Sequence, residues 1–134
     1  MLLNEFKNKK ILIVEDDSSS SQLLTEYFSL TGVKIVLAKT GNEAIHFFKK
    51  YAKEIDLILM DIKLPEKNGL KATQEIRLFN KHIPIIAQTA SVSHEEVKSY
   101  LSSGMNDCIP KPYRQDEIIN IVLKHLPKQK SLNV

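Results

Sequence analysis

The sequence predicts an α/β fold in which helices cover both faces of a parallel β-sheet. Short apolar runs, bounded by turn-forming residues, alternate five times with segments that have the apolar spacing of amphipathic helices. The first and third runs are apolar at their centres, as in strands that are buried on both faces of a sheet. No repeat, linker or low-complexity segment divides the 134 residues, which suffice for one domain with its own hydrophobic core.

Five strands are expected, and the third sets the frame for the others. Its apolar run Leu57–Met60 leads directly into Asp61, and Pro65 and Gly69 then interrupt regular structure. Asp61 is therefore expected at the carboxyl end of a central strand, where ligands bind in open α/β sheets. The alternative is that Asp61 only caps the helix that follows. The predicted strands span residues 9–14, 33–38, 56–60, 84–88 and 106–109.

A helix is expected after each strand. The first has apolar residues at positions i, i+1, i+4 and i+5 and ends at Gly32. Capping boxes predict that the second helix begins in residues 40–43 and the fourth in residues 93–96, while the third and fifth are expected at 69–80 and 115–126. The side chains expected to face the core are Leu23, Leu24, Tyr27, Phe28, Ala44, Ile45, Phe48, Leu70, Thr73, Ile76, Phe79, Val97, Tyr100, Leu101, Ile118, Ile119, Val122, Leu123 and Leu126.

The composition excludes several classes of protein. The net charge is +3, from 19 Lys and Arg against 16 Asp and Glu, and this excess is too small and scattered to predict a nucleic-acid partner. A single Cys rules out a disulfide framework or a cysteine-based zinc site. The N-terminus contains Glu5 and lacks the apolar region of a signal peptide, and no apolar run approaches the roughly 18 residues that span a bilayer. We therefore expect a cytoplasmic protein without membrane insertion.

Polar and charged side chains follow four of the predicted strands. Because the carboxyl ends of parallel strands meet at one edge of a sheet, we expect these side chains to lie close together there. The group comprises Glu15, Asp16 and Asp17 after the first strand, Asp61 after the third, Thr89 and Ser91 after the fourth, and Lys111 after the fifth.

The carboxylates in this group predict a magnesium site and a phosphoryl acceptor. Glu15, Asp16 and Asp61 would repel one another unless a cation lies between them or one of them is protonated. Mg²⁺ prefers one or two carboxylates, a carbonyl and waters, and leaves positions open for phosphate oxygens. With the positive charge of Lys111 and the hydroxyl of Thr89, these groups would bind a phosphoryl group during its transfer to Asp61 as an acyl phosphate.

Each signal also has a structural interpretation. An acidic run after a strand is often a solvated turn, a lysine before a proline usually faces solvent, and a threonine after a buried strand usually caps a helix. Four such features, in the right order on four different strands, favour the functional interpretation.

The motifs resemble the receiver domain of response regulators in two-component signalling, especially the receivers of hybrid histidine kinases. The resemblance implies a flavodoxin-like (βα)₅ fold with strand order 2-1-3-4-5. It also implies a single receiver domain over residues 1–134, with a core at about 9–126 and a flexible tail at 127–134. The motifs that carry it are residues 11–17, residues 59–65 with Gly69, Thr89–Ala90 and Lys111–Pro112.

The resemblance further implies what the residues do. The domain would take a phosphoryl group from a histidine kinase or a histidine phosphotransfer protein, would be a monomer or weak dimer, and would not turn over an external substrate. The peptide bond before Pro112 would be cis. The implied site has Asp61 as phosphoacceptor with Thr89 and Lys111, and Mg²⁺ held by Glu15, Asp16, Asp61 and the backbone carbonyl of Lys63.

Two positions depart from the family pattern. Cys108 stands three residues before the site lysine, where the family usually has a Tyr or Phe whose ring moves with the Thr hydroxyl. Without this ring we expect the face formed by residues 93–126 to respond weakly to phosphorylation, unless Tyr100 or Tyr113 replaces it. Glu15 stands where many members have Asp, and its longer side chain is expected to reach the metal through water.

Three other functions were weighed. A phosphatase of the haloacid dehalogenase type needs a second Asp two residues after the nucleophile, where this chain has Lys63. A flavin- or nucleotide-binding protein needs a first turn rich in Gly, Ser or Thr, and residues 15–17 would instead repel a phosphate. A degenerate receiver that serves only as a protein-interaction scaffold is supported by Cys108 alone.

Overall fold

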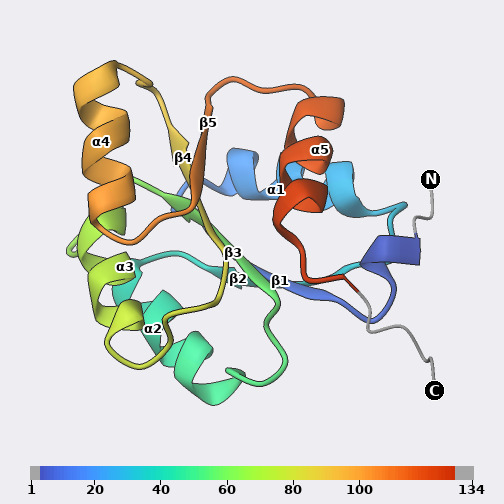
Figure 1. Cartoon of the computed structure of the whole chain (residues 1–134). Coiled ribbons are helices and arrows are strands. Elements are labelled where there is room, and N and C mark those ends of the chain that lie inside the picture. The colour runs from blue at the N-terminus through green and yellow to red at the C-terminus, as the bar shows by residue number, and fades with distance from the viewer. Residues whose placement is uncertain (1–3, 129–134) are drawn as a thin grey trace.

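Five short strands form the sheet at the centre of the computed structural model, which describes residues 4–128 (Figure 1). Every pair of neighbouring strands is parallel, and their order is β2-β1-β3-β4-β5. The predicted fold and strand order are therefore confirmed. The strands are β1 (Lys10–Val14), β2 (Lys34–Ala38), β3 (Leu57–Asp61), β4 (Ile85–Thr89) and β5 (Asp107–Pro110).

Helices cover both faces of the sheet. Figure 1 shows α1 and α5 together on one side and α2, α3 and α4 on the other.

Across the described residues, no helix is both long enough and apolar enough to cross a membrane. The predicted flexible tail lies mostly outside the described residues. The helices are α1 (Ser18–Phe28), α2 (Gly41–Lys50), α3 (Gly69–Arg77), α4 (His94–Ser102) and α5 (Gln115–His125), preceded by the short 3₁₀ helix η1 (Asn4–Phe6).

Side-chain caps begin the helices where the sequence predicted them. The hydroxyls of Thr40 and Ser93 accept the backbone N–H groups of Glu43 and Glu96, at 3.0 and 3.3 Å. Neither glutamate is seen to accept the backbone N–H of its cap residue, as a full capping box requires, although Glu96 accepts the Ser93 hydroxyl at 3.3 Å. Glu43 instead accepts the N–H of the residue before the cap, and Glu96 accepts the hydroxyl of Ser91 at 2.7 Å.

The strands supply side chains to two separate cores because successive residues of a strand point to opposite faces. Each fully buried Leu, Ile or Val contributes roughly 1.5–3 kcal/mol to folding. The core under α2, α3 and α4 contains Leu12, Val14, Ile58, Met60, Ile85 and Ala87, and the core under α1 and α5 contains Ile11, Ile13, Leu57, Leu59 and Ile86.

A guanidinium joins three segments at the end of the sheet where β4 and β5 begin. Arg77, the last residue of α3, donates to the carbonyl of Gly104 at 2.9 Å and to the side-chain oxygen of Asn106 at 3.0 Å. The same Asn106 oxygen accepts the N–H of Ile85 at 2.8 Å. Helix α3 ends at Arg77, earlier than predicted. The side chain of this last residue is bonded to the segment that leads into β5.

A few apolar side chains differ from the sequence prediction. Phe6 is fully buried and packs edge-on against Phe28, with 5.9 Å between ring centroids, although no element was predicted before residue 9. Leu23 and Leu101 are 43% and 50% exposed, while the neighbours Leu24 and Tyr100 are buried, so each pair lies at the edge of its helix's buried face. Phe79 lies beyond the end of α3 and is 45% exposed.

Gly69 permits the close approach of α3 to the end of β3. A β-carbon at this position would lie 2.1 Å from the backbone carbonyl oxygen of Asp61. The N–H of Gly69 also donates to the carbonyl of Ile62 at 2.9 Å. The start of α3 thus packs directly on the backbone that carries Asp61.

We expect Gly69→Ala to destabilise the protein by roughly 1–3 kcal/mol, because the new methyl group must displace backbone atoms. Equilibrium unfolding in urea measures this loss. Lys71→Ala, in the same helix at an exposed position, is the control and should unfold close to wild type. Equal stability of Gly69→Ala and Lys71→Ala would contradict the close packing.

Candidate functional site

Four strand ends bring the predicted side chains to one edge of the sheet. Glu15 and Asp16 follow β1, Asp61 and Thr89 are the last residues of β3 and β4, and Lys111 follows β5. All five line a cleft of about 560 Å³. The structure thus places together the residues that the sequence assigned to one site.

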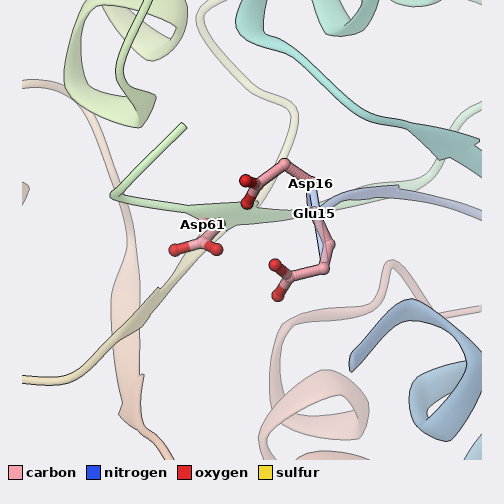
Figure 2. A group of neighbouring side chains, drawn as sticks. All are labelled: Glu15, Asp16 and Asp61. Atoms are coloured by element: carbon pink, nitrogen blue, oxygen red, sulfur yellow. The ribbon is translucent and has the colours of Figure 1, made fainter. Parts of the chain in front are cut away.

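Three carboxylates that line this cleft, from the ends of β1 and β3, lie next to one another (Figure 2). Glu15, Asp16 and Asp61 each place one carboxylate oxygen within 4.8 Å of the others. Glu15 and Asp61 are 3% and 6% exposed, whereas Asp16 is exposed. This set consists only of oxygen donors and is open on the side of Asp16, so it fits a hard divalent cation that retains water ligands.

Lys111 supplies the positive charge closest to these acids. Its Nζ lies 2.7 Å from Glu15 Oε1 and 3.1 Å from Asp61 Oδ2. The peptide bond between Lys111 and Pro112 is cis, as the resemblance implied. With three ionised carboxylates and one ammonium, the cluster retains two negative charges, which a divalent cation would balance.

The buried acid and its lysine partner titrate away from their ordinary values. Burial raises the pKa of Glu15 from 4.5 to about 6, and the charge of Asp61 adds to this effect, while the hydrogen bond from Lys111 opposes it. Burial alone would lower the pKa of Lys111, but the hydrogen bond to Glu15 and the charge of Asp61 outweigh it, so that the pKa is raised. Lys111 therefore remains an ammonium, and Glu15 takes up a proton as the pH falls through about 6.

The two oxygens of Asp61 have different neighbours. Oδ2 accepts from Lys111, while Oδ1 accepts the backbone N–H of Lys63 at 3.2 Å. These two bonds fix the carboxylate at the mouth of the cleft. The side chain of Lys63 is exposed, and its backbone carbonyl stays a predicted metal ligand.

The hydroxyl of Thr89 is held by three groups. Thr89 Oγ1 lies 2.7 Å from the hydroxyl of Tyr100, donates toward the carbonyl of Ser91 at 3.0 Å and accepts the N–H of Ser91 at 3.1 Å. The Tyr100 hydroxyl also lies 3.2 Å from Glu96 Oε2. Burial raises the pKa of Tyr100, which therefore stays a neutral phenol at physiological pH.

Of the two tyrosines considered as substitutes for the missing ring, Tyr100 is the one that contacts Thr89. Tyr113 lies elsewhere and donates to the side-chain oxygen of buried Gln88 at 2.7 Å. Cys108 is half-buried and packs against the core under α2, α3 and α4. Burial raises the pKa of its thiol, as in a small structural hydrophobe.

Comparison with known families bears out the resemblance drawn from the motifs. The chain matches the response regulator receiver domain over residues 11–123. It is 36% identical over 120 residues to the transcription factor SKN7 of Saccharomyces cerevisiae, in a match that covers 90% of this chain. The chain spans only 19% of that relative's length.

Two solved structures are similar over nearly their whole length. The receiver domain of the Saccharomyces cerevisiae response regulator Ssk1, solved with the histidine phosphotransfer protein Ypd1, is 28% identical with a TM-score of 0.85 and covers 96% of this chain and 95% of its own. The receiver domain of sensor histidine kinase PA1611 from Pseudomonas aeruginosa PAO1 is 31% identical with a TM-score of 0.80, and the match covers 88% and 97%. It was solved with a magnesium ion coordinated in its active site cleft.

The raised pKa of Glu15 predicts a pH-dependent stability in metal-free solution. Its folded value of about 6 lies above its ordinary value of 4.5. The associated stability is therefore fully present below pH 4.5 and is lost as the pH rises through 6. We expect wild type to lose about 2 kcal/mol relative to Glu15→Gln over this interval, because that variant cannot titrate here.

Urea unfolding of both proteins in chelator, at several pH values between 4 and 7.5, measures this difference. The comparison cancels every group that titrates equally in the two proteins. A difference in unfolding free energy that stays constant with pH would contradict the raised pKa of Glu15.

Proposed function

Since the chain belongs to the response regulator receiver domain family, we propose that Asp61 accepts a phosphoryl group from a phosphohistidine and that the domain relays it in a two-component phosphorelay. The placement of Asp61 carries this proposal. Its carboxylate lies at the open end of a central strand, 3.1 Å from an ammonium and beside two further carboxylates. A nucleophile with this charge environment suits phosphoryl transfer.

In the transfer, an oxygen of Asp61 attacks the phosphorus atom and forms an oxygen–phosphorus bond. The bond between phosphorus and the donor imidazole breaks, and its electron pair returns to the imidazole nitrogen. The hydrogen bonds from Lys111 and from the Lys63 amide hold the carboxylate in place before the attack. The closed packing at Gly69 keeps the end of β3 from shifting.

The metal site that we assign consists of Glu15, Asp16, Asp61 and the backbone carbonyl of Lys63. Mg²⁺ in this position would supply positive charge to the phosphoryl oxygens. Receiver domains bind this ion, and the PA1611 receiver holds one in its active site cleft. Because Lys111 already binds Glu15, we expect Glu15 to contact the metal through water rather than directly.

Lys111 and Thr89 are assigned to the phosphoryl oxygens. An ammonium has three N–H donors, and Glu15 and Asp61 engage two of them. In the part of the chain that the structure describes, this leaves one donor of Lys111 for a phosphoryl oxygen. The Thr89 hydroxyl would supply a second hydrogen bond once it leaves its present partners.

The donor that we propose is a histidine kinase or a histidine phosphotransfer protein. The Ssk1 receiver, which has the same fold, was solved with such a phosphotransfer protein. We further propose one receiver domain with its core at about residues 9–126, acting as a monomer or weak dimer in the cytoplasm without nucleic acid. Its role is signalling and not the turnover of an external substrate.

Two alternatives fit the site less well. A phosphatase of the haloacid dehalogenase type would require an acid where Lys63 stands. A scaffold without phosphorylation would have no need for the complete set of charged groups and the hydroxyl beside them. That set, in one cleft, is Glu15, Asp16, Asp61, Thr89 and Lys111.

Incubation with acetyl phosphate and Mg²⁺, followed by intact mass measurement, tests the proposed function. We expect wild type to gain one phosphoryl group, and Asp61→Asn or removal of Mg²⁺ by chelator to abolish the gain. Asp17→Asn is the matched control, because Asp17 caps α1 through Ser20 and an amide oxygen can do the same. Phosphorylation that persists in Asp61→Asn would show that Asp61 is not the acceptor.

Lys63 is expected to slow the loss of the phosphoryl group. Its exposed side chain lies on the lining of the cleft, two residues after Asp61, where it can cover the approach of water. Phosphorylated Lys63→Ala should therefore release phosphate several-fold faster than wild type. Lys63→Met keeps the length without the charge and should stay close to wild type. A slower Lys63→Ala would refute shielding, and fast release from Lys63→Met would assign the effect to charge.

A further inference from the structure

A chain of hydroxyl groups links the end of β4 to the first turn of α4. The shortest contact joins Thr89 Oγ1 and the Tyr100 hydroxyl at 2.7 Å. The Tyr100 hydroxyl in turn lies 3.2 Å from Glu96 Oε2 and 3.0 Å from the carbonyl of Ser91. Tyr100 is 3% exposed, so its hydroxyl depends on these protein partners.

Each hydroxyl in this chain has a single proton to donate. Glu96 can only accept when it is ionised, and the hydrogen bond from Ser91 lowers its pKa and keeps it so. Thr89 gives its proton either to the carbonyl of Ser91 or to Tyr100, and Tyr100 can give its own to Glu96, to Ser91 or to Thr89. A chain that ends on a carboxylate is stronger than an isolated hydroxyl–carbonyl bond.

In either case the Thr89 proton is already engaged with Ser91 or Tyr100 and cannot also serve a phosphoryl oxygen. We propose that Tyr100 is a positioning residue that holds the Thr89 hydroxyl in its unphosphorylated arrangement, and that phosphorylation of Asp61 transmits its signal to α4 by withdrawing Thr89 from Tyr100. This inference depends on the proposed function of Asp61. When the Thr89 hydroxyl turns to the phosphoryl group, the Tyr100 hydroxyl loses its 2.7 Å contact with Thr89, and its bonds to Ser91 and Glu96 must rearrange.

The position of Tyr100 determines which element receives the signal. Cys108 lies on β5, and in the described part of the chain its thiol forms no hydrogen bond. Tyr100 lies within α4, and Glu96 belongs to the first turn of the same helix. A change at Thr89 therefore acts on α4 itself, without an intermediate ring on β5.

Beryllofluoride, bound with Mg²⁺ as a phosphoryl mimic, provides the test. Tyr100→Phe keeps the ring and removes only the hydroxyl, so Thr89 becomes easier to withdraw. We expect this variant to bind beryllofluoride roughly two- to tenfold more tightly than wild type, the range that one hydrogen bond supplies. The affinity for Mg²⁺ alone should not change, because Tyr100 touches none of the three carboxylates.

Glu96→Gln supplies the second arm, because it removes the charge at the end of the chain. It should also tighten beryllofluoride binding, and the double variant with Tyr100→Phe should gain less than the sum of the two in free energy. Backbone amide shifts of residues 93–102 should respond to beryllofluoride in wild type, and those of free Tyr100→Phe should already lie part of the way toward the bound values.

Cys108→Ala is the matched control and should bind beryllofluoride as wild type does. Equal or weaker binding by Tyr100→Phe would overturn the inference, and so would the same tightening in Cys108→Ala, since loosened packing would then explain the effect. If wild type binds beryllofluoride and Asp61→Asn does not, the proposed function is supported even when the Tyr100→Phe result contradicts this inference. Wild type that does not bind it would overturn both.

Discussion

The burial of two acids beside one lysine constrains the structure around the site. Glu15 and Asp61 are almost completely buried, and Lys111, which comes from the far end of the sequence, binds both of them. This contact requires β1, β3 and β5 to end at the same edge, which the parallel registers provide. It also leaves Glu15 with a raised pKa, because one ammonium does not fully offset the burial of two carboxylates. The three carboxylates already lie close together, so the site favours a further cation.

The strands and the edge at which the site lies could be predicted from sequence because both depend on local signals. Leu57–Met60 is apolar on both faces, which is typical of a central strand. In an open sheet of parallel strands, ligands bind beyond the carboxyl ends of the strands, so the site is expected next to Asp61. The N-caps at Thr40 and Ser93 are equally local. The order of the strands came only from the family resemblance, because periodicity alone does not determine which strand lies beside which.

What the sequence left open depends on contacts between distant residues. Phe6 precedes the first strand without any periodic pattern, and only its packing on Phe28 buries it. From the sequence, either Tyr100 or Tyr113 could be the partner of Thr89. Both lie near it in the chain, and each has a hydroxyl at the end of its ring that can form a hydrogen bond. The structure assigns Tyr100 to Thr89 and Tyr113 to Gln88, on opposite faces of the sheet. The short sequence distance from Thr89 and the capping glutamate Glu96 were the available signals for Tyr100.

The two ends of α4 are held by different contacts, and the guanidinium of Arg77 acts at the carboxy-terminal end. It ties α3 to Gly104 and Asn106, directly after α4, and the N–H of Met105 binds the carbonyl of Tyr100 at 3.1 Å. The carboxy-terminal end of α4 is thereby anchored, while its amino-terminal end is attached through the hydroxyl groups beside the cleft. One end of α4 is therefore held by contacts far from the cleft, and the other end by groups that line the cleft. A rearrangement that starts at the cleft would therefore reach the amino-terminal turn of α4 before its anchored carboxy-terminal end.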